Sequence, residues 1–126
     1  MTNVDSLTGT PDRAALFHAL DVELTQGRPV ALLIIDLDHF KSINDAFGHL
    51  RGDAALLGVT KRALEALGRP LYRYAGDEFV ALLTGDDVDR ALERAETLVR
   101  AVAASPLLQD PPLSVTISVG VAVSRE

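Results

Sequence analysis

The sequence contains no cysteine and no tryptophan, and it contains only one methionine. The absence of cysteine excludes disulfide bonds and thiolate metal sites. The amino-terminal segment MTNVDS has neither the basic residues nor the apolar core of a signal peptide, and the most apolar run, PVALLIID, is far shorter than the roughly 20 residues that cross a bilayer. These features predict a cytoplasmic protein that makes no membrane contact of its own.

Basic residues are also scarce. Twelve Lys and Arg stand against eighteen Asp and Glu, which gives a net charge of -6 at pH 7. An acidic protein repels the phosphate backbone of DNA and RNA, so we expect no nucleic-acid partner. A chain of 126 residues with 48% hydrophobic content is long enough for one core and too short for two. We therefore predict a single domain over residues 1–126.

Apolar residues at helical spacing predict three helices. The first is expected to begin at Thr10 and Pro11, a hydroxyl cap followed by a first-turn proline, and to end at Gly27. The second is expected over residues 53–68. Asp86 and Asp87 are expected to cap the third, whose apolar face is formed by Val88, Ala91, Leu92, Ala95, Val99 and Val102 and which closes at Ser105 and Pro106.

Four further segments are typical of strands. Residues 30–36 are continuously apolar, as expected for a central strand covered on both faces. LYRYA and EFVALL flank Gly76 and Asp77 and predict a hairpin, and residues 113–123 alternate strictly. Without the first helix the order is β-α-β-β-α-β, which is the order of the ferredoxin-like α+β fold.

This topology predicts where the acidic residues meet. Right-handed crossovers place the first and third strands side by side and antiparallel. The end of the first strand, Asp36, then lies beside the beginning of the third, Asp77 and Glu78. We expect these three carboxylates, together with that of Asp38, to gather at one edge of the sheet.

Carboxylates so close together repel one another unless a cation lies among them. Oxygen ligands without nearby Cys or paired His favour Mg²⁺ or Mn²⁺ over Zn²⁺, and Mg²⁺ commonly recruits substrate phosphates. The cluster therefore predicts nucleotide chemistry. The alternative is that Asp77 and Glu78 are ordinary turn residues and that Asp36 is a polar strand end.

Three segments resemble the GGDEF family of diguanylate cyclases. RYAGDEF (residues 73–79) resembles the signature RYGGDEF, and DSLTGTPDR (residues 5–13) resembles the opening motif DxLTGLPNR. IDLDHFKSINDAFGHLRGD (residues 35–53) is similar to the central metal- and guanine-binding stretch, and SVTISVGVA is similar to the late strand. The motifs occur in the family's order and extend over residues 5–123.

The resemblance implies a palm-like cyclase that condenses two GTP molecules into cyclic di-GMP across a homodimer of half-sites. It implies that Asp36, Asp77 and Glu78 are catalytic and that, with the carbonyl of Leu37, they bind Mg²⁺ or Mn²⁺. It also implies substrate contacts from the same motifs. These are the backbone N–H groups of His39 and Phe40 and the side chain of Lys41 at the phosphates, Asn44 and Asp53 at the guanine, and Gly76 in the signature.

The guanine-reading pair has a chemical rationale. A carboxylate at Asp53 can accept hydrogen bonds from guanine N1–H and N2–H₂, which adenine does not offer. Apart from the resemblance, Asn44 would be interpreted as a turn residue and Asp53 as a helix cap. Gly48 and Gly52 are expected to bracket the loop between them.

The sequence departs from the family pattern in three places. Ala75 replaces the first signature glycine, which the backbone tolerates if φ is negative. The family's C-terminal helix, with its phosphate-binding Lys and Arg, has no counterpart after the late strand, and Arg51 and Arg125 are the candidate replacements. Ala66 and Arg69 occupy the positions of the inhibitory Arg-x-x-Asp site, so that site is expected to be absent.

Two alternatives remain beside an active cyclase. One is a GTP-binding or dimerisation module without turnover, and the other is a related cyclase that uses another nucleotide. The pair formed by Asn44 and Asp53 argues against the second alternative. The homodimer that catalysis needs is expected to be weak or partner-assisted, because the sequence has no coiled-coil heptads.

Overall fold

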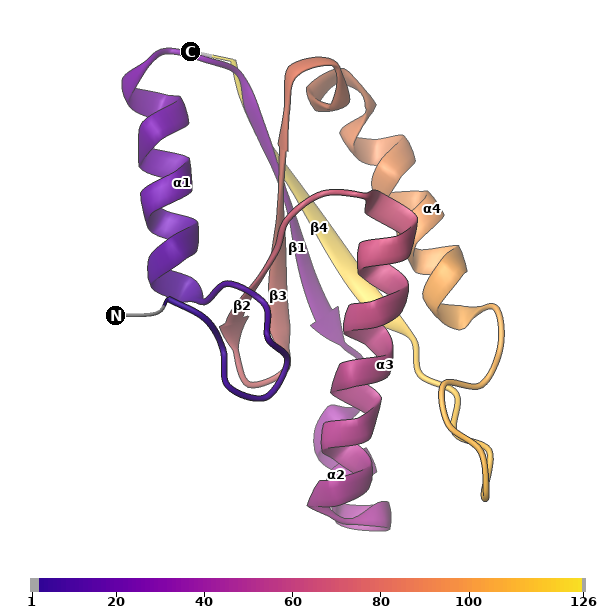
Figure 1. Cartoon of the computed structure of the whole chain (residues 1–126). Helices are drawn as coiled ribbons and strands as arrows, with labels where there is room; N and C mark the ends of the chain where they lie inside the picture. Colours follow the sequence, from indigo (N-terminus) through magenta and orange to yellow (C-terminus); the bar gives the residue numbers. More distant parts are fainter. Residues whose placement is uncertain (1–2, 126) are drawn as a thin grey trace.

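The computed structural model describes residues 3–125 as an antiparallel four-stranded sheet with helices on both faces (Figure 1). The strand order is β2-β3-β1-β4, which confirms the predicted α+β class and ferredoxin-like arrangement. No helix in this part of the chain is long and apolar enough to cross a membrane. The elements are α1 (Arg13–Thr25), β1 (Val30–Leu37), α2 (Phe40–Phe47), α3 (His49–Leu67), β2 (Leu71–Ala75), β3 (Glu78–Thr84), the 3₁₀ helix η1 (Gly85–Arg90), α4 (Ala91–Ala103) and β4 (Ile117–Ser124).

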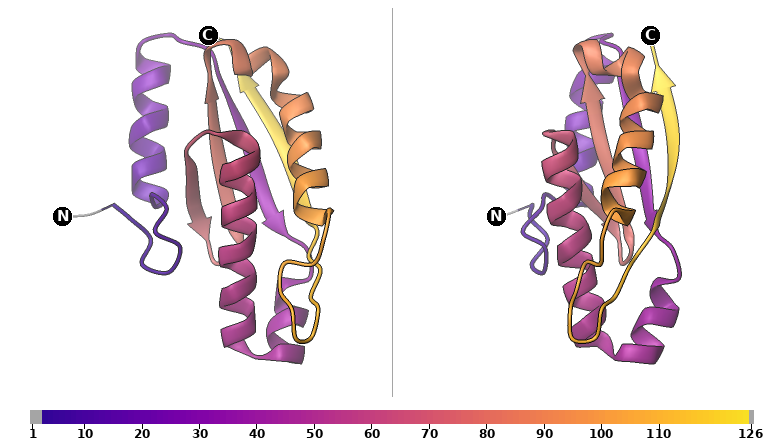
Figure 2. Two further views of the ribbon diagram at one scale, coloured as in Figure 1. Left: turned by 45° about the vertical axis from the view of Figure 1, so that its right-hand side comes forward. Right: turned by 90° about the vertical axis from the view of Figure 1, so that its right-hand side faces the viewer.

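The two faces of the sheet are covered differently (Figure 2). Alternate residues of β1, namely Leu33, Ile35 and Leu37, are buried in the main core beneath α3 and α4. The opposite face packs against α1 through a smaller cluster that includes Leu16 and Val80. The larger cluster holds most of the buried apolar side chains, so it supplies most of the hydrophobic stabilisation.

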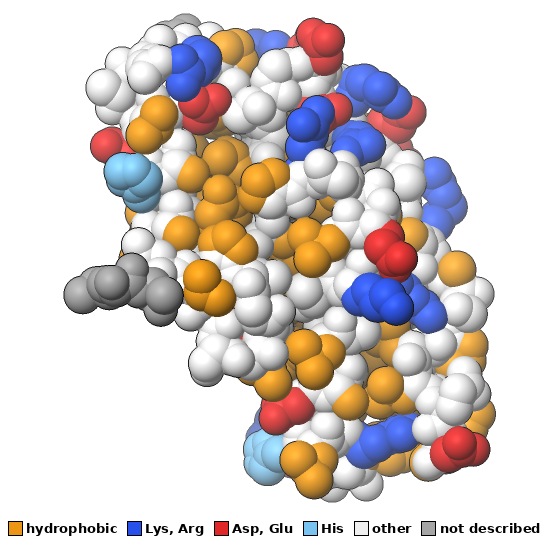
Figure 3. Space-filling view, viewed as in Figure 1, with side chains coloured by type: hydrophobic (Ala, Val, Ile, Leu, Met, Phe, Trp, Pro, Cys, Tyr) orange, Lys and Arg blue, Asp and Glu red, His pale blue; other side chains and the backbone are white. Residues whose placement is uncertain are grey.

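The helix α1 leaves part of its face of the sheet open. Ile34 is 41% exposed and Phe17 is 49% exposed. A hollow of about 300 Å³ lies between α1 and the sheet, and hydrophobic side chains gather on this side of the molecule (Figure 3). The prediction that residues 30–36 are covered on both faces is therefore wrong at Ile34.

The first helix begins later than the sequence predicts. Its N-cap is Asp12, whose carboxylate accepts a hydrogen bond from the Ala15 N–H at 3.0 Å. Thr10 is buried, and its hydroxyl lies 2.7 Å from that of Thr8. Because Asp is as good a cap as Thr, the helix starts at the cap that the tertiary structure leaves free.

The segment expected to be a loop between Asn44 and Asp53 is helical. Residues 40–47 form α2, and α3 begins at His49 rather than at Asp53. Gly48, with φ of 87°, makes the turn between the two helices, whereas Gly52 lies within α3.

The starts of α4 and β4 also differ from the sequence-based prediction. Asp86 and Asp87 do not cap an α-helix directly, because η1 precedes α4, and Asp87 instead pairs with Arg69 at 2.5 Å. The last strand begins at Ile117 rather than at residue 113, and its first residue pairs with Leu37, the last residue of β1. A strand can extend only as far as its partner does, which explains the shorter β4.

Candidate active site

The carboxylates lie where the end of β1 meets the start of β3. Asp36 is directly opposite Glu78 in the antiparallel ladder. The Leu37 N–H donates a hydrogen bond to the Asp77 carbonyl at 3.1 Å, so the hairpin tip is tied to the end of β1. The structure thus places Asp36, Asp77 and Glu78 at one edge of the sheet, as the topology predicts, with Leu37 next to them.

The charges at this edge affect the protonation of Asp36. Partial burial raises the pKa of Asp36 most, and the negative charges of Asp77, Glu78 and Asp38 raise it further. The protonated form of Asp36 is favoured here because the neighbouring carboxylates oppose its ionisation. A divalent cation at the same place would relieve the same repulsion.

Asp38 has partners that the sequence did not reveal. Its carboxylate accepts hydrogen bonds from the Thr116 and Ser118 hydroxyls, each at 2.7 Å. These two bonds lower the pKa of Asp38, with Ser118 the larger contribution. Asp38 therefore links the turn after β1 to β4, and it is engaged there rather than free beside the other three carboxylates.

The donor set fits a cation that is only partly coordinated by protein. In residues 3–125, no three His, Asp or Glu side chains lie close enough together to hold a metal ion by themselves. Mg²⁺ is commonly held by one or two carboxylates, with waters and substrate phosphates filling the other positions. Asp36, the Leu37 carbonyl, Asp77 and Glu78 are oxygen donors of the appropriate kind at one edge.

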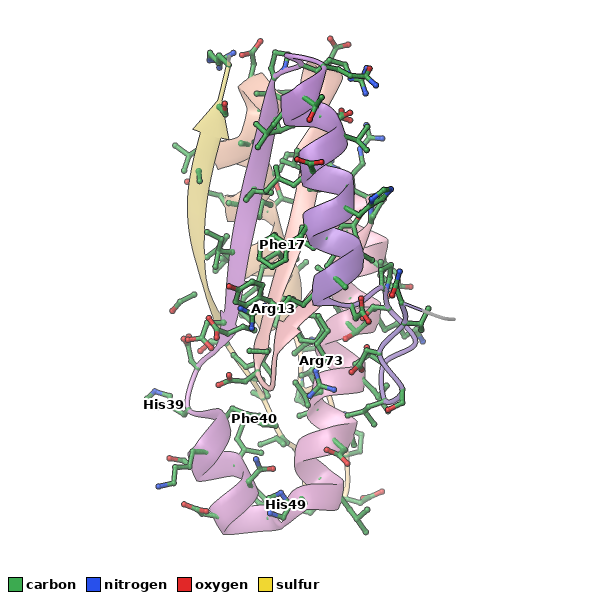
Figure 4. All side chains as sticks on the ribbon, turned by 90° about the vertical axis from the view of Figure 1, so that its left-hand side faces the viewer. Arg13, Phe17, His39, Phe40, His49 and Arg73 are labelled. Carbon is green, nitrogen blue, oxygen red and sulfur yellow. The ribbon has the colours of Figure 1, made fainter. Side chains whose placement is uncertain are left out.

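The start of α2 lies directly beyond this edge (Figure 4). His39 is its N-cap, with φ of 60° in the left-handed region, and it makes no side-chain cap hydrogen bond. This uncommon conformation turns the chain sharply after Asp38. The N–H groups at the start of a helix have no acceptor within the helix, so those of His39 and Phe40 are available to bind an anion. The Phe40 ring packs against the main core.

Asn44 and Asp53 occupy the two packed helices α2 and α3. The Asn44 Oδ1 atom is buried and has no hydrogen-bond partner among the described residues. It lies where a side chain on Gly52 would be, 1.8 Å from the position of a Cβ there. Gly52 thus makes room for Asn44, and Asp53 follows it in α3. An unsatisfied buried amide oxygen costs free energy and suggests an absent partner.

Arg73 fixes the hairpin tip, and sequence reasoning missed this role. Its guanidinium donates to the Ala75 carbonyl at 3.3 Å and to the Gly76 carbonyl at 2.7 Å, and it pairs with the Asp5 carboxylate at 3.0 Å. Asp5 also accepts from the N–H and hydroxyl of Thr8, each at 2.8 Å. The opening motif that contains Asp5 and the signature that contains Arg73 are both visible in the sequence, but neither indicates that the two residues are in contact.

The two signature positions are alike in that the backbone requires glycine at neither of them. Ala75 is not among the non-glycine residues with positive φ, so the backbone accommodates its methyl group as predicted for negative φ. Gly76 also lacks a positive φ, and a Cβ there would meet nothing within 4 Å. The folded chain itself therefore does not require glycine at residue 76.

Arg51 and Arg125, the candidate replacements for the family's phosphate-binding Lys and Arg, contact other parts of the protein. Arg51 donates to the Gln109 carbonyl at 3.0 Å and also to the Pro111 carbonyl. Arg125 pairs with Asp89 at 2.6 Å. Both guanidinium groups thus already have protein partners in this structure.

Comparisons with known proteins match nearly the whole chain to one family. The family described as "Diguanylate cyclase, GGDEF domain" matches residues 2–126. The diguanylate cyclase DgcP of Pseudomonas aeruginosa is 39% identical over 124 residues, which cover 93% of this chain and 18% of that protein. Across several curated relatives, the chain spans about a fifth to a third of their length.

Solved structures show the same fold. The diguanylate cyclase SiaD of Pseudomonas aeruginosa, crystallised with its activator SiaC, has a TM-score of 0.86 at 31% identity, covering 97% of this chain and 50% of that one. The GGDEF domain of DgcB from Caulobacter crescentus, crystallised with c-di-GMP, has a TM-score of 0.87 at 26% identity, covering 97% and 75%.

Proposed function

The chain belongs to the GGDEF family of diguanylate cyclase domains, and on that premise we propose that it condenses two GTP molecules into cyclic di-GMP. The observation that carries the proposal is the position of Asp36, directly opposite Glu78 and next to the hairpin tip. This acidic edge adjoins the free N–H groups at the start of α2. Oxygen ligands beside an anion-binding helix start are suited to a metal-bound triphosphate.

Asp36, the Leu37 carbonyl, Asp77 and Glu78 would hold Mg²⁺ or Mn²⁺. When bound, the metal supplies a Lewis acid that favours ionisation of the ribose 3′-hydroxyl and stabilises charge at the α-phosphate. The backbone N–H groups of His39 and Phe40 would orient the phosphates, with Lys41 adding a positive charge.

Specificity for guanine would come from the corner between α2 and α3. Asp53 would accept hydrogen bonds from guanine N1–H and N2–H₂. Asn44 supplies an amide whose buried oxygen has no partner in the described part of the chain. A guanine edge would satisfy polar groups there that adenine, with its different donor and acceptor pattern, would leave unpaired.

Each half-site would hold one nucleotide. Cyclisation forms two phosphodiester bonds, each when the 3′-oxygen of one GTP attacks the α-phosphate of the other and pyrophosphate leaves. Two chains must therefore face each other with their carboxylate edges apposed. Gly76 lies at the hairpin tip, where a bare backbone would let the substrate approach closely.

Incubation with GTP and Mg²⁺, followed by chromatographic identification of the products, tests this function. Cyclic di-GMP and pyrophosphate are expected, and both should disappear in Asp77→Asn. GTP binding without either product would instead identify a binding module. Equal turnover of ATP would contradict the assigned base specificity.

A further inference from the structure

Arg13, the first residue of α1, is a cation without an anionic partner in residues 3–125. Its guanidinium carbon lies 4.4 Å from the centre of the Tyr74 ring and 5.9 Å from that of Phe17. The two nearby carboxylates are engaged, Asp12 in capping α1 and Asp5 in pairing with another arginine. A positive charge at a helix N-terminus is disfavoured by the helix dipole, so α1 gives no reason for arginine at this position.

Tyr74 places Arg13 level with the carboxylate edge. Tyr74 directly precedes Ala75, which pairs with Glu78, and Glu78 lies opposite Asp36. Two strand spacings separate β2 from β1, so the guanidinium lies on the order of 10 Å from Asp36. This separation is comparable to the length of an extended triphosphate.

Arg13 and Asp36 are also on the same face of the sheet. Tyr74 packs beside Val80 in the cluster under α1, and residues two apart on a strand, such as Glu78 and Val80, share a face. Asp36, directly across from Glu78, projects from that face too. Figure 4 shows Arg13 lying across it from α1.

A surface depression of about 320 Å³ connects Arg13 with the signature. Its lining includes Arg13, Tyr74 and the hairpin tip at Ala75 and Gly76. The other lining residues are Asp5, Asp12 and Arg73, whose charged groups already have partners. Arg13 is thus the charged group of this depression that has no oppositely charged partner among the described residues.

We propose that Arg13 binds the terminal phosphates of the nucleotide whose α-phosphate is held at the carboxylate edge. This inference rests on the proposed function. Tyr74 holds the guanidinium by a cation–π contact, which leaves its N–H groups free to donate to phosphate oxygens. Arg51 and Arg125 are engaged elsewhere, so Arg13 supplies a charge that those two residues do not.

Calorimetric titration of the full chain with GTP and GMP in Mg²⁺ tests the assignment. Arg13→Gln is expected to weaken GTP binding about 10- to 100-fold, the effect of losing a charged hydrogen-bond partner, and to leave GMP affinity unchanged. Arg13→Lys keeps the charge but loses the planar stack on Tyr74, so its affinity for GTP should lie between those of the wild type and Arg13→Gln. Arg28→Gln, at the other end of α1 and paired with Glu23, is the matched control and should bind GTP normally.

Substitutions of Tyr74 test whether its ring holds the Arg13 guanidinium in place. Tyr74→Phe keeps the aromatic face and should preserve the preference for GTP over GMP, whereas Tyr74→Leu should reduce it. Unchanged GTP affinity in Arg13→Gln, or an equal loss of GTP and GMP, would overturn the role of Arg13 and leave the proposed function standing. Failure of the wild-type chain to bind GTP with Mg²⁺ would overturn both.

Discussion

Gly52→Ala should impair guanine recognition without unfolding the protein. A Cβ at residue 52 would lie 1.8 Å from the Asn44 Oδ1 atom and 2.9 Å from its Cγ. Atoms cannot approach so closely, so the Asn44 side chain must rotate away. Phe40, at 3.5 Å from the same position, would remain in ordinary contact.

The two energetic effects of this substitution oppose each other. Alanine is about 1 kcal/mol more favourable than glycine inside a helix. Forcing a side chain out of its rotamer costs roughly 0.5–1.5 kcal/mol. Because the Asn44 oxygen has no hydrogen-bond partner among the described residues, moving it breaks no bond there. We therefore expect the free energy of unfolding to change by no more than about 1 kcal/mol.

Nucleotide competition and chemical denaturation together check this prediction. Gly52→Ala should lose preference for GTP over ATP to the same extent as Asn44→Ala. Gly58→Ala is the matched control in α3, since the atoms nearest to its Cβ would belong to the Leu107 side chain, the first at 3.2 Å, and not to Asn44. Undiminished guanine preference in Gly52→Ala would refute the reasoning, as would global unfolding of that variant.

Three further predictions concern the carboxylate edge and the hairpin tip. Asp36→Asn should raise the melting temperature at neutral pH without metal, because the raised pKa of Asp36 means that its ionised form destabilises the folded protein. This gain in melting temperature should vanish as the pH falls below the usual carboxyl range. In thermal melts, Mg²⁺ should stabilise the wild type but not the variant. Asp5→Asn should cost about 1.5–3 kcal/mol by breaking the pair with Arg73. Burial opposes ionisation of Asp5, but hydrogen bonds from Thr8 and Arg73 hold its pKa below the usual value, so this cost should be full at neutral pH and disappear as denaturation is followed to pH values below that pKa. Gly76→Ala should leave thermal stability within about 0.5 kcal/mol yet reduce product formation, and unchanged activity would show that no substrate passes close to this residue.

The strand order could be predicted because it depends on patterns that a sequence displays directly. The apolar run over residues 30–36 and the alternation near the end fix the strands, and the crossover rule then places Asp36 beside Glu78. The shared edge of Asp36, Asp77 and Glu78 follows from the topology, whereas the metal-binding roles and the part of Leu37 come from the family resemblance. Their contacts with the ligand remain predictions.

The helix α2 was missed because its cues are weak. It has only eight residues, and its N-cap, His39, is not a residue type that favours capping. Phe40, Ile43 and Phe47 recur at helical spacing and are the signal that could have revealed it. Gly52 pointed to a loop, but it lies in a helix to make room for Asn44.

Long-range polar contacts were likewise beyond the reach of local patterns. The pair between Asp5 and Arg73 joins residues 68 positions apart, and the bonds from Thr116 and Ser118 to Asp38 join residues 78 and 80 positions apart. Such partners are chosen by the fold rather than by neighbours in the chain. The stacking of Arg13 on Tyr74 belongs to the same class.

The most direct test of the account is the dependence of cyclic di-GMP synthesis on protein concentration. If two half-sites must meet, product formed per chain from GTP and Mg²⁺ should rise with concentration, and fusion to a parallel dimeric coiled coil should raise it further by increasing the effective concentration. Activity per chain that stays constant on dilution, while light scattering shows only monomer, would contradict the half-site mechanism. Absence of product even in the fused dimer would contradict the assignment of cyclase activity to this chain.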